Sequence, residues 1–315
     1  MQLRQGYSDL DQAVRGHVVA LGNFDGVHAG HAHVIDRAAA LARRLGAPLG
    51  VALFEPHPRR FFAPDAPPFR LMSAARRNER LAALGVKAVF ELPFDAAMSQ
   101  MSPEGFVQDV LVDGLGIAGV VTGSDFHFGH KRAGSTQDLA ALGQRLGFAA
   151  DFADLLDNGV DKISSTRIRK CLSDGDVRAA ATLLGQSWTI EGEVLRGDQI
   201  GRTIGFPTAN IDLADFTRPA YGVYAVRAGL AGEAPSRPAV ANFGNRPTVD
   251  GKTERFEVHL FDFDQDIYGR ELSVSFEAFL RPEQTFSGLD ALKAQIAADA
   301  DAARALLTGA SGPST

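Results

Sequence analysis

The hydrophobic pattern of this 315-residue chain changes once, near Gln186, and that change constrains the fold more than any other feature. Before it, short apolar runs typical of strands alternate with helical stretches, and the clearest runs are residues 18–21, 49–54, 88–92 and 119–122. This alternation predicts a mainly parallel sheet with helices on both faces, whose ligands bind beyond the carboxyl ends of the strands. The first half is therefore predicted to be a Rossmann-like α/β domain.

After Gln186 the chain is rich in β-forming residues, and glycine–proline turns separate the runs 188–194, 222–227, 255–261 and 271–279. Such spacing predicts an antiparallel β-barrel. We expect one long helix to close the barrel, because apolar residues fall at helical spacing in an otherwise polar and alanine-rich stretch. These residues are Phe286, Leu289, Leu292 and Ile296.

Length and composition limit the number of domains and the kinds of partner that the chain can have. A hydrophobic content of 45% can supply two cores, and we place the domains at residues 1–185 and 186–308, followed by a disordered tail at 309–315. The formal net charge is −6 and no basic run is present, which argues against a nucleic-acid partner. The expected partners are small molecules, and any self-association is expected to be weak.

Cysteine usage and the N-terminus indicate the compartment. The single cysteine, Cys171, excludes an intrachain disulfide and a thiolate metal cluster within one chain, which fits a reducing compartment. Residues 1–12 carry charges where a signal peptide has its apolar region, and no apolar stretch reaches membrane-spanning length. The sequence therefore predicts a cytoplasmic protein that does not enter the membrane.

The segment GNFDGVHAGH, residues 22–31, connects the apolar run 18–21 to an alanine-rich helical pattern. Glycines at a strand end let the backbone approach a ligand, and free N–H groups at a helix start favour an anion, so a nucleotide's phosphates belong there. His28 and His31 are three residues apart, on one face of the first turn, where both rings can reach the same phosphate chain. The predicted nucleotide-binding residues of this turn are Gly22, Asn23, Phe24, Asp25, Gly26 and Gly30.

Two other interpretations of the histidine pair stay open at this point. An i,i+3 pair can bind zinc, although no cysteine and no helical carboxylate lies nearby at ligand spacing. A histidine at a helix start can also serve only as its cap.

A second ligand wall is predicted in TGSDFHFGHKRAG, residues 122–134, which follows a strand-like run and brings Asp125 to the strand's carboxyl end. Phe126 and Phe128 can stack on a planar ring, and Lys131 and Arg132 can meet a phosphate. The alternative is a surface loop with two anchoring aromatic residues.

Two shorter segments carry further candidates. In ISSTRIR, residues 163–169, Arg167 falls in the first turn of a helix and suits a phosphate, unless the segment is only an ordinary capped helix. In FEPHPRR, residues 54–60, two prolines shape the loop that presents His57. The candidate helix caps of the first segment are Ser164, Ser165 and Thr166.

In the second half, RGDQIGRTIGFPTAN at residues 196–210 places three glycines, among them Gly201 and Gly205, before a turn made rigid by proline. It lacks the G-K-[ST] ending of a P-loop, so the lysine-and-hydroxyl chemistry of that motif is not assumed. Thr208 and Asn210 are hard oxygen ligands that an extended chain holds on one side, where they suit Mg²⁺. The alternative is a glycine-rich hairpin connection.

The run RFEVHLF, residues 255–261, alternates so that Glu257 and His259 share one face and the apolar residues share the other. Glu257 is thus a carboxylate on a rigid strand, as a general base for a hydroxyl should be. The alternative is a solvent-facing glutamate.

In their order along the chain, these motifs resemble the bifunctional riboflavin kinase and FAD synthetase family of bacteria. The first half matches the adenylyltransferase module through GNFDGVHAGH, FEPHP, GSDFHFG and ISSTRIR; the second matches the flavokinase module through GRTIGFPTAN, YGVYAV, NFGNRPTV, the Glu257 strand and LRPEQTF. Two positions depart from the family pattern. His127 stands where arginine is expected, and Phe243 where a smaller aliphatic residue is usual.

The resemblance implies two ATP-dependent reactions: riboflavin and ATP give FMN and ADP at the barrel, and FMN and ATP give FAD and pyrophosphate at the α/β domain. Glu257 would take the proton of the ribityl hydroxyl, with Mg²⁺ on ATP held by Thr208 and Asn210. In the adenylyl transfer no general base is needed, because the FMN phosphate is already ionised. The charge-stabilising residues implied there are His28, His31 and Arg167.

The resemblance also implies the remaining binding residues. The flavin-binding set is His57, Asp125, Phe126, Phe128, Arg281, Glu283 and Phe286, and the nucleotide-binding set adds Ser164, Ser165, Thr166, Gly201 and Gly205. Two other functions stay open: a flavokinase fused to a nucleotidyltransferase with another acceptor, and a non-catalytic nucleotide- or flavin-binding regulator, against which the intact Glu257 and Thr208 argue.

Overall fold

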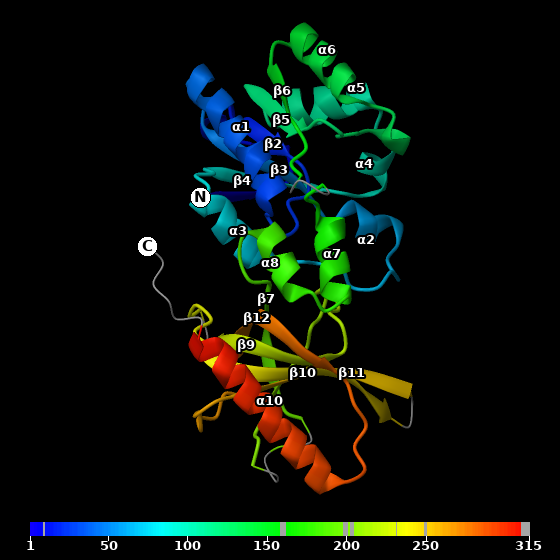
Figure 1. Cartoon of the computed structure of the whole chain (residues 1–315). Coiled ribbons are helices and arrows are strands. Elements are labelled where there is room, and N and C mark those ends of the chain that lie inside the picture. Colours follow the sequence, from blue (N-terminus) through cyan, green and yellow to red (C-terminus); the bar gives the residue numbers. More distant parts are fainter. Residues whose placement is uncertain are drawn as a thin grey trace. The chain divides into compact units, whose positions relative to one another are not determined.

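The computed structural model describes residues 1–8, 10–157, 162–197, 201, 205–230, 232–248 and 251–309. The chain folds into two compact units (Figure 1), the first formed by Met1–Pro67 with Ala74–Ser164 and the second by Pro68–Ser73 with Ser165–Thr315. The units therefore divide about twenty residues before the predicted boundary at 185/186. The boundary at 185/186 stays a prediction about functional domains.

The first unit is built on a six-stranded parallel sheet in the order β1-β4-β3-β2-β5-β6. Its strands are β1 (Gln2–Gln5), β2 (Val18–Leu21), β3 (Leu49–Glu55), β4 (Ala88–Pro93), β5 (Gly119–Gly123) and β6 (Ala149–Ala153). The four runs predicted as strands are β2 to β5, which confirms the parallel α/β fold. The edge strands β1 and β6 escaped prediction because neither is a clear apolar run: β1 is polar and largely exposed, and β6 has the sequence AADFA.

The helices of the first unit flank this sheet (Figure 1). They are η1 (Gln12–Val14), α1 (Ala29–Leu45), α2 (Pro58–Phe62), α3 (Ala74–Ala83), α4 (Ala96–Gln100), α5 (Pro103–Gly105), the π-helix η2 (Phe106–Gly114), η3 (His130–Arg132) and α6 (Thr136–Leu146). α1 packs on β2 and β5 through Ile35, Ala38 and Leu41, which recur at helical spacing and are buried. It ends at Gly46, whose left-handed backbone (φ 61°) suits a glycine.

The strand order reverses at β2, because β2 pairs with β3 on one side and with β5 on the other. In open parallel sheets the crevice beyond such a reversal is where ligands bind. The segments after β2 and β5, which carry GNFDGVHAGH and GSDFHFG, therefore both lie at the crevice beyond this point of the sheet.

The second unit contains a closed six-stranded barrel in the order β10-β11-β8-β7-β12-β9, with every pair antiparallel. Its strands are β7 (Thr189–Leu195), β8 (Ala209–Ile211), β9 (Gly222–Leu230), β10 (Arg237–Thr248), β11 (Gly251–Leu260) and β12 (Glu271–Pro282), and its helices are α7 (Ser165–Ser173), α8 (Val177–Leu184) and α10 (Leu289–Gly309). The predicted barrel and closing helix are confirmed.

The barrel has an aromatic interior and an apolar outer strip. Inside, Phe256 and Phe276 stack with ring centroids 5.5 Å apart, and Trp188 lies 4.7 Å from Phe276. Outside, α10 lies across β9, β10 and β12 (Figure 1), and Ala303 of the helix belongs to the same buried apolar cluster as Val223 of β9. This outer packing leaves room for a cavity toward the start of α10.

The closing helix differs from its prediction at both ends. It begins at Leu289, so Phe286 precedes it, and Leu289 is 53% exposed rather than part of the buried stripe. The helix continues to Gly309, the first residue of the predicted tail at 309–315. Residues 310–315, most of the predicted tail, lie outside the described residues.

A short segment from the first half of the sequence, Pro68–Ser73, belongs to the second unit. The backbone N–H of Arg70 donates to the Asp215 carbonyl at 2.8 Å, and the buried indole N–H of Trp188 donates to the Leu71 carbonyl at 2.9 Å. The Arg169 guanidinium donates to the Phe69 carbonyl at 2.7 Å. Sequence periodicity did not reveal this segment, because the pairing joins residues a hundred or more positions apart.

Among the described residues, no helix is both long and apolar enough to cross a membrane.

Candidate functional site

The turn after β2 brings the two predicted histidines into contact. His28 is the N-cap of α1, and its Nδ1 accepts a hydrogen bond from the backbone N–H of His31 at 3.2 Å. The two rings are stacked, with centroids 3.7 Å apart and planes 14° from parallel. Because Nδ1 of His28 is the acceptor, neutral His28 carries its proton on Nε2. His28 thus caps the helix, as the alternative interpretation expected, and this hydrogen bond fixes its neutral ring in the tautomer with the proton on Nε2.

The same turn holds an unusual backbone. Phe24 and Val27 have positive φ values, 54° and 39°, as does Gly26 at 91°. A positive φ is sterically costly for a β-branched residue such as Val27, and such strain concentrates at ligand-binding turns. Phe24 is only 1% exposed, so its side chain anchors the turn in the core, and its backbone is the part that can face a ligand.

Gly30 brings a second motif to this helix start. A Cβ atom on Gly30 would lie 3.2 Å from the His28 ring and 3.4 Å from the carbonyl oxygen of Ile163, the first residue of ISSTRIR. The close approach explains why the turn needs glycine between its histidines. The other predicted residues of the turn, Gly22, Asn23 and Asp25, are partly exposed.

The rest of ISSTRIR lies on either side of the boundary between the units. Ser164 ends the first unit, whereas α7 starts at Ser165 in the second, with Thr166 and Arg167 in its first turn. The helix start is as predicted. The meeting of Arg167 with His28 and His31 stays a prediction.

The segment after β5 forms a polar edge over a hydrophobic anchor. Asp125 is exposed and pairs with Lys162. Phe126 is half-buried, whereas Phe128 is 5% exposed and packs on Phe106 at 5.8 Å between ring centroids. Phe128 therefore behaves as the anchoring residue of the alternative interpretation, and Phe126 keeps surface for a ligand.

The segment after β3 presents His57 beside a group of phenylalanines that the sequence analysis missed. His57 caps α2, and its Nδ1 accepts from the backbone N–H of Arg59 at 3.0 Å. Phe61 and Phe62 both contact Phe94, with ring centroids 5.4 and 5.6 Å apart. Phe62 is 67% exposed. The consecutive residues Phe61 and Phe62 were the feature of the sequence that could have indicated this aromatic surface.

In the second unit a cavity of about 390 Å³ opens on the outer face of the barrel beside α10. It collects seven predicted residues from three separate motifs, namely Gly201, Thr208, Asn210, Glu257, Arg281, Glu283 and Phe286. It also contains residues that the sequence analysis did not assign, among them Asn242, Asn245, Arg255, His259 and Asp299.

Glu257 lies at the centre of a polar row across three strands. It is the register partner of Asn210 on β8 and of Asn242 on β10. Its neighbours Phe256 and Val258 are 1% and 0% exposed in the barrel interior, so the predicted alternation is confirmed. The carboxylate is thereby held on the cavity side by a strand fixed on both edges.

Thr208 directly precedes β8 and also lines the cavity, so Thr208 and Asn210 lie on the same side, as predicted. Next to them, the Nδ1–H of His259 donates to the Pro207 carbonyl oxygen at 2.7 Å. Gly205 has φ of 90° and is exposed, with no atom within 4 Å of where a Cβ would lie. Residues 198–200 and 202–204 of this glycine-rich loop lie outside the described residues.

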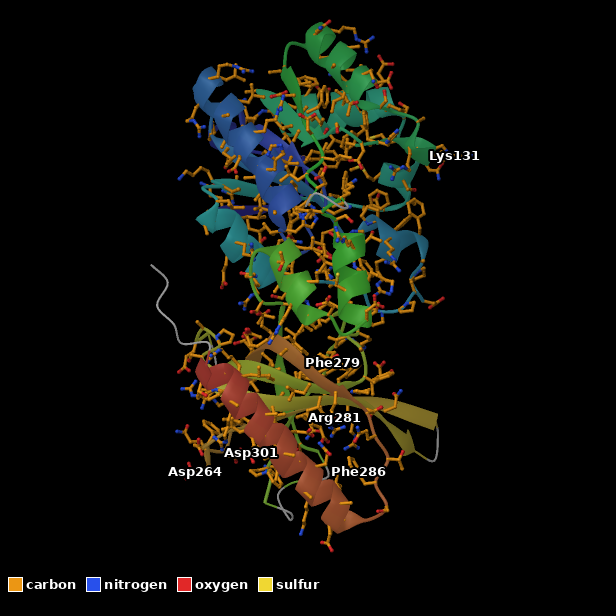
Figure 2. All side chains as sticks on the ribbon, viewed as in Figure 1. Lys131, Asp264, Phe279, Arg281, Phe286 and Asp301 are labelled. Carbon is orange, nitrogen blue, oxygen red and sulfur yellow. The ribbon has the colours of Figure 1, made fainter. Side chains whose placement is uncertain are left out.

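The segment LRPEQTF forms the wall opposite this row. Glu283 reaches Gly244 of NFGNRPTV so closely that a Cβ atom there would overlap a carboxylate oxygen. Arg281 lies 5.7 Å from the Phe286 ring centroid and is paired with Asp299 of α10. Figure 2 shows Arg281 between β12 and α10, with Phe286 near the start of that helix.

The two departures from the family pattern lie outside the cavity. Phe243 is 0% exposed in the barrel interior, where it stacks on Tyr221 with ring centroids 4.8 Å apart. The hydroxyl of Tyr221 donates to Glu254 at 2.8 Å. Burial, and to a smaller extent this hydrogen bond, raises the pKa of the phenol, so the hydroxyl keeps its proton. His127 is exposed, with Nδ1 2.9 Å from the Asp125 carbonyl.

Within the described part of the chain, no group of three histidine, cysteine, aspartate or glutamate residues is arranged to hold a metal ion. Zinc ligation by the histidine pair thus finds no third ligand of that kind among those residues. The oxygen donors Thr208 and Asn210 are of the chemical type that Mg²⁺ accepts.

A parallel α/β unit with a stacked histidine pair at a helix start, joined to a closed barrel with a carboxylate in its outer cavity, defines a two-domain nucleotide-dependent transferase. A family model described as FAD synthetase matches residues 10–167, and one described as riboflavin kinase matches residues 184–307. The chain belongs to the family of bifunctional riboflavin kinase/FMN adenylyltransferases.

Relatives with that name match over nearly the whole chain. The chain is 43% identical to one from Pseudomonas fluorescens, covering 97% of this chain and 98% of that one, and 41% identical to one from Escherichia coli K12, covering 96% and 97%. A solved structure named as a macrolide-efflux protein from Streptococcus pneumoniae is 31% identical, with a TM-score of 0.86, and covers 96% of this chain and 99% of that one.

Proposed function

We propose that this chain makes FMN from riboflavin in its barrel cavity and FAD from FMN in its α/β unit. The observation that carries the proposal is the convergence of Glu257, Asn210 and Thr208 on one cavity of a size suited to a small organic ligand. In the first reaction a ribityl oxygen bonds to the γ-phosphorus of ATP, ADP leaves, and the hydroxyl proton is taken up. In the second, an FMN phosphate oxygen bonds to the α-phosphorus of a second ATP, and pyrophosphate leaves.

Glu257 is the base of the kinase reaction in this proposal. A general base must lie within hydrogen-bond reach of the proton that it removes. The support is positional: Glu257 lies on a strand paired on both sides, so its place at the cavity does not depend on a flexible loop.

Thr208 and Asn210 are proposed to hold Mg²⁺ together with the phosphates of ATP. Mg²⁺ prefers oxygen ligands and keeps much of its water, which two side-chain oxygens on one strand edge allow. When bound, the ion would neutralise phosphate charge as the γ-phosphoryl group is transferred.

ATP has a separate hollow available next to the same threonine. This second hollow, of about 380 Å³, shares Thr208 with the cavity and is also lined by Asp264, Asp266 and Tyr268. Its carboxylates suit the hydroxyls of ribose better than they suit phosphates. We therefore place the nucleoside of ATP there, with Gly201 and Gly205 near the phosphates, and the flavin in the larger cavity.

In the α/β unit His28 and His31 are proposed to stabilise charge as pyrophosphate leaves. The proposal is supported by their stacked arrangement at a helix start and by the fixed Nε2–H tautomer of His28. Arg167, Ser164, Ser165 and Thr166 are proposed to complete the phosphate site.

The flavin of the second reaction is proposed to contact the partly exposed aromatic cluster of the same unit. Phe61, Phe62 and Phe94 form a ring-on-ring surface next to His57, and such surfaces suit a planar heterocycle. Phe126 and Asp125 would flank it. Because both reactions consume ATP, we propose a cytoplasmic location.

One incubation tests the proposal. The protein is mixed with riboflavin, ATP and Mg²⁺, and the flavins are separated by chromatography and identified by mass. We expect FMN first and FAD later, with FAD alone increasing when FMN is supplied. FMN without FAD would indicate another nucleotidyl acceptor, and neither product would indicate a non-catalytic binding protein.

A further inference from the structure

The cavity wall contains an ion pair between β12 and α10, and one of its two residues, Asp299, has no role assigned so far. The Arg281 Nη2 donates to Asp299 Oδ2 at 2.7 Å, and its Nε donates to Oδ1 at 2.9 Å, which makes a two-pronged bond. The side chains are only 15% and 8% exposed. Both residues line the cavity, so this bond forms part of its wall.

A distortion of β12 puts Arg281 in this position. The register of β12 against β9 shifts between Phe279 and Arg281, so these residues pair with consecutive positions, Tyr224 and Val223. Phe279 packs on Tyr224, with ring centroids 5.1 Å apart, whereas Arg281 joins Val223 on the face beneath α10. In a regular strand residues two apart share a face; the bulge separates them and directs Arg281 to the helix (Figure 2).

Asp299 is held from the helix side as well. Gln295, one turn earlier on α10, donates to its Oδ1 at 2.9 Å. Leu292, Ile296 and Asp299 recur at helical spacing and all line the cavity. A carboxylate on an otherwise apolar helix stripe is costly unless it is paired, so its location indicates a constraint from Arg281.

The pairing leaves Arg281 poorly suited to bind a phosphate. Its Nε and Nη2 donate to Asp299, and its Nη1 donates to the Pro282 carbonyl at 3.0 Å. The charge is compensated and the guanidinium plane is fixed close to the Phe286 ring. What the pair offers to a ligand is an oriented flat surface, which is complementary to a planar ring.

We propose that Asp299 is a positioning residue for the isoalloxazine ring of riboflavin. It holds Arg281, and through it the segment from Pro282 to Phe286, so that this wall of the cavity is in place before the flavin binds. The inference rests on the proposed kinase function and adds the residue that sets affinity for the ring rather than for the ribityl chain.

The first test compares Asp299→Asn with Asp301→Asn, an exposed position on the same helix. In Asp299→Asn we expect the KM for riboflavin to rise about tenfold or more while kcat stays within about threefold, because the reacting groups on β8 and β11 are untouched. The KM for ATP and the formation of FAD from FMN should not change. Asp301→Asn should match the wild type throughout.

A second variant separates positioning from folding. Asp299→Asn leaves a buried cation, so the barrel of that variant can be destabilised. The double variant Arg281→Met/Asp299→Leu replaces both charged side chains by apolar ones and is expected to stay folded, as judged by thermal melting and the fluorescence of Trp188. It should still show the raised KM.

A ring-only ligand locates the effect. Lumiflavin, which has the isoalloxazine ring without the ribityl chain, should lose affinity for both variants by the same factor as riboflavin in fluorescence titrations. An unchanged KM in the folded double variant, or a loss for riboflavin but not for lumiflavin, would overturn the inference. Failure of the wild type to make FMN would instead overturn the proposed function.

Discussion

Glu257 of β11 and Asn210 of β8 are direct register partners across an antiparallel pair, although they lie 47 positions apart in the sequence. Side chains of such partners emerge on the same face, within contact range of each other. The pairing places the proposed base beside the proposed magnesium ligand without any flexible connection. In the proposed kinase site, the relative position of these two residues is therefore set by the register of the barrel strands.

Glu257→Gln should abolish most of the kinase activity. Glutamine keeps the shape and an accepting oxygen but cannot take up the proton, so FMN formation should fall by about 10² to 10⁴. The loss should appear in kcat, with little change in the KM for riboflavin. Steady-state kinetics of both half-reactions measure this.

The matched control is Glu271→Gln, an exposed glutamate on β12 of the same barrel. It should leave both reactions at wild-type rates, and Glu257→Gln should still convert supplied FMN to FAD. Near-normal FMN production by Glu257→Gln would identify Glu257 as an ordinary surface glutamate.

His28→Ala should lower FAD formation from FMN by about 10² to 10³, the usual effect of removing one donor that stabilises transition-state charge. The same change removes the cap of α1, so a stability loss of about 1 kcal/mol is expected as well. His28→Asn retains a capping side chain and should recover the stability but not the activity. The measurements are thermal melting and the two half-reaction rates.

His33→Ala, on the same helix, is the control for the histidine pair and should have little effect on either rate. His31→Ala should reduce FAD formation as His28→Ala does and leave FMN formation intact. An equal loss of both reactions would point to misfolding rather than to lost charge stabilisation.

A fragment that starts at Gln186 should convert riboflavin to FMN but be less stable than the intact chain. It keeps the barrel and α10 but lacks Pro68–Ser73, so the buried indole N–H of Trp188 loses its acceptor, the Leu71 carbonyl. An unpaired buried donor costs about 1–3 kcal/mol. Because Trp188 is the only tryptophan of the chain, urea unfolding followed by its fluorescence reports on this contact.

A longer fragment that starts at Ser165 is the comparison, because it retains α7 and α8 but also lacks Pro68–Ser73. It should unfold at a urea concentration between those of the short fragment and the intact chain. Equal stability of all three would show that neither the helices nor the segment supports the barrel. A folded short fragment without kinase activity would contradict the assignment of the kinase site to the barrel.

His17 should make the first unit sensitive to mild acid. It is 6% exposed with its ring edge against Phe90, and burial lowers its pKa below the ordinary value of 6.5, an effect that a hydrogen bond with the Val14 backbone only partly offsets. The unfolded chain then binds the proton at higher pH than the folded one, so stability is complete above about pH 6.5 and declines as the pH falls below it.

His17→Phe should flatten this decline, as measured by urea unfolding between pH 7.5 and 5. His127→Phe, at an exposed position of the same unit, should leave the pH dependence unchanged. A wild-type slope that persists in His17→Phe would assign the acid sensitivity to other groups.

The sequence by itself determined the elements and the chemistry that they carry. Period-two alternation placed Glu257 on the opposite face from Phe256 and Val258, and glycine spacing with an apolar run located the helix start at His28 and His31. These are local signals, because strand and helix periods are read within a few residues.

Only the tertiary structure decided which residues meet. The register of Glu257 with Asn210, the bulge that sends Arg281 to Asp299, and the bond from Trp188 to Leu71 all join distant segments. In the sequence Asp299 is recognisable only as a carboxylate within an apolar helix stripe. Its pairing with Arg281 depends on the bulge in β12, which the sequence pattern does not show. Closure of the barrel sets register through the packing of all six strands at once, which no local period encodes.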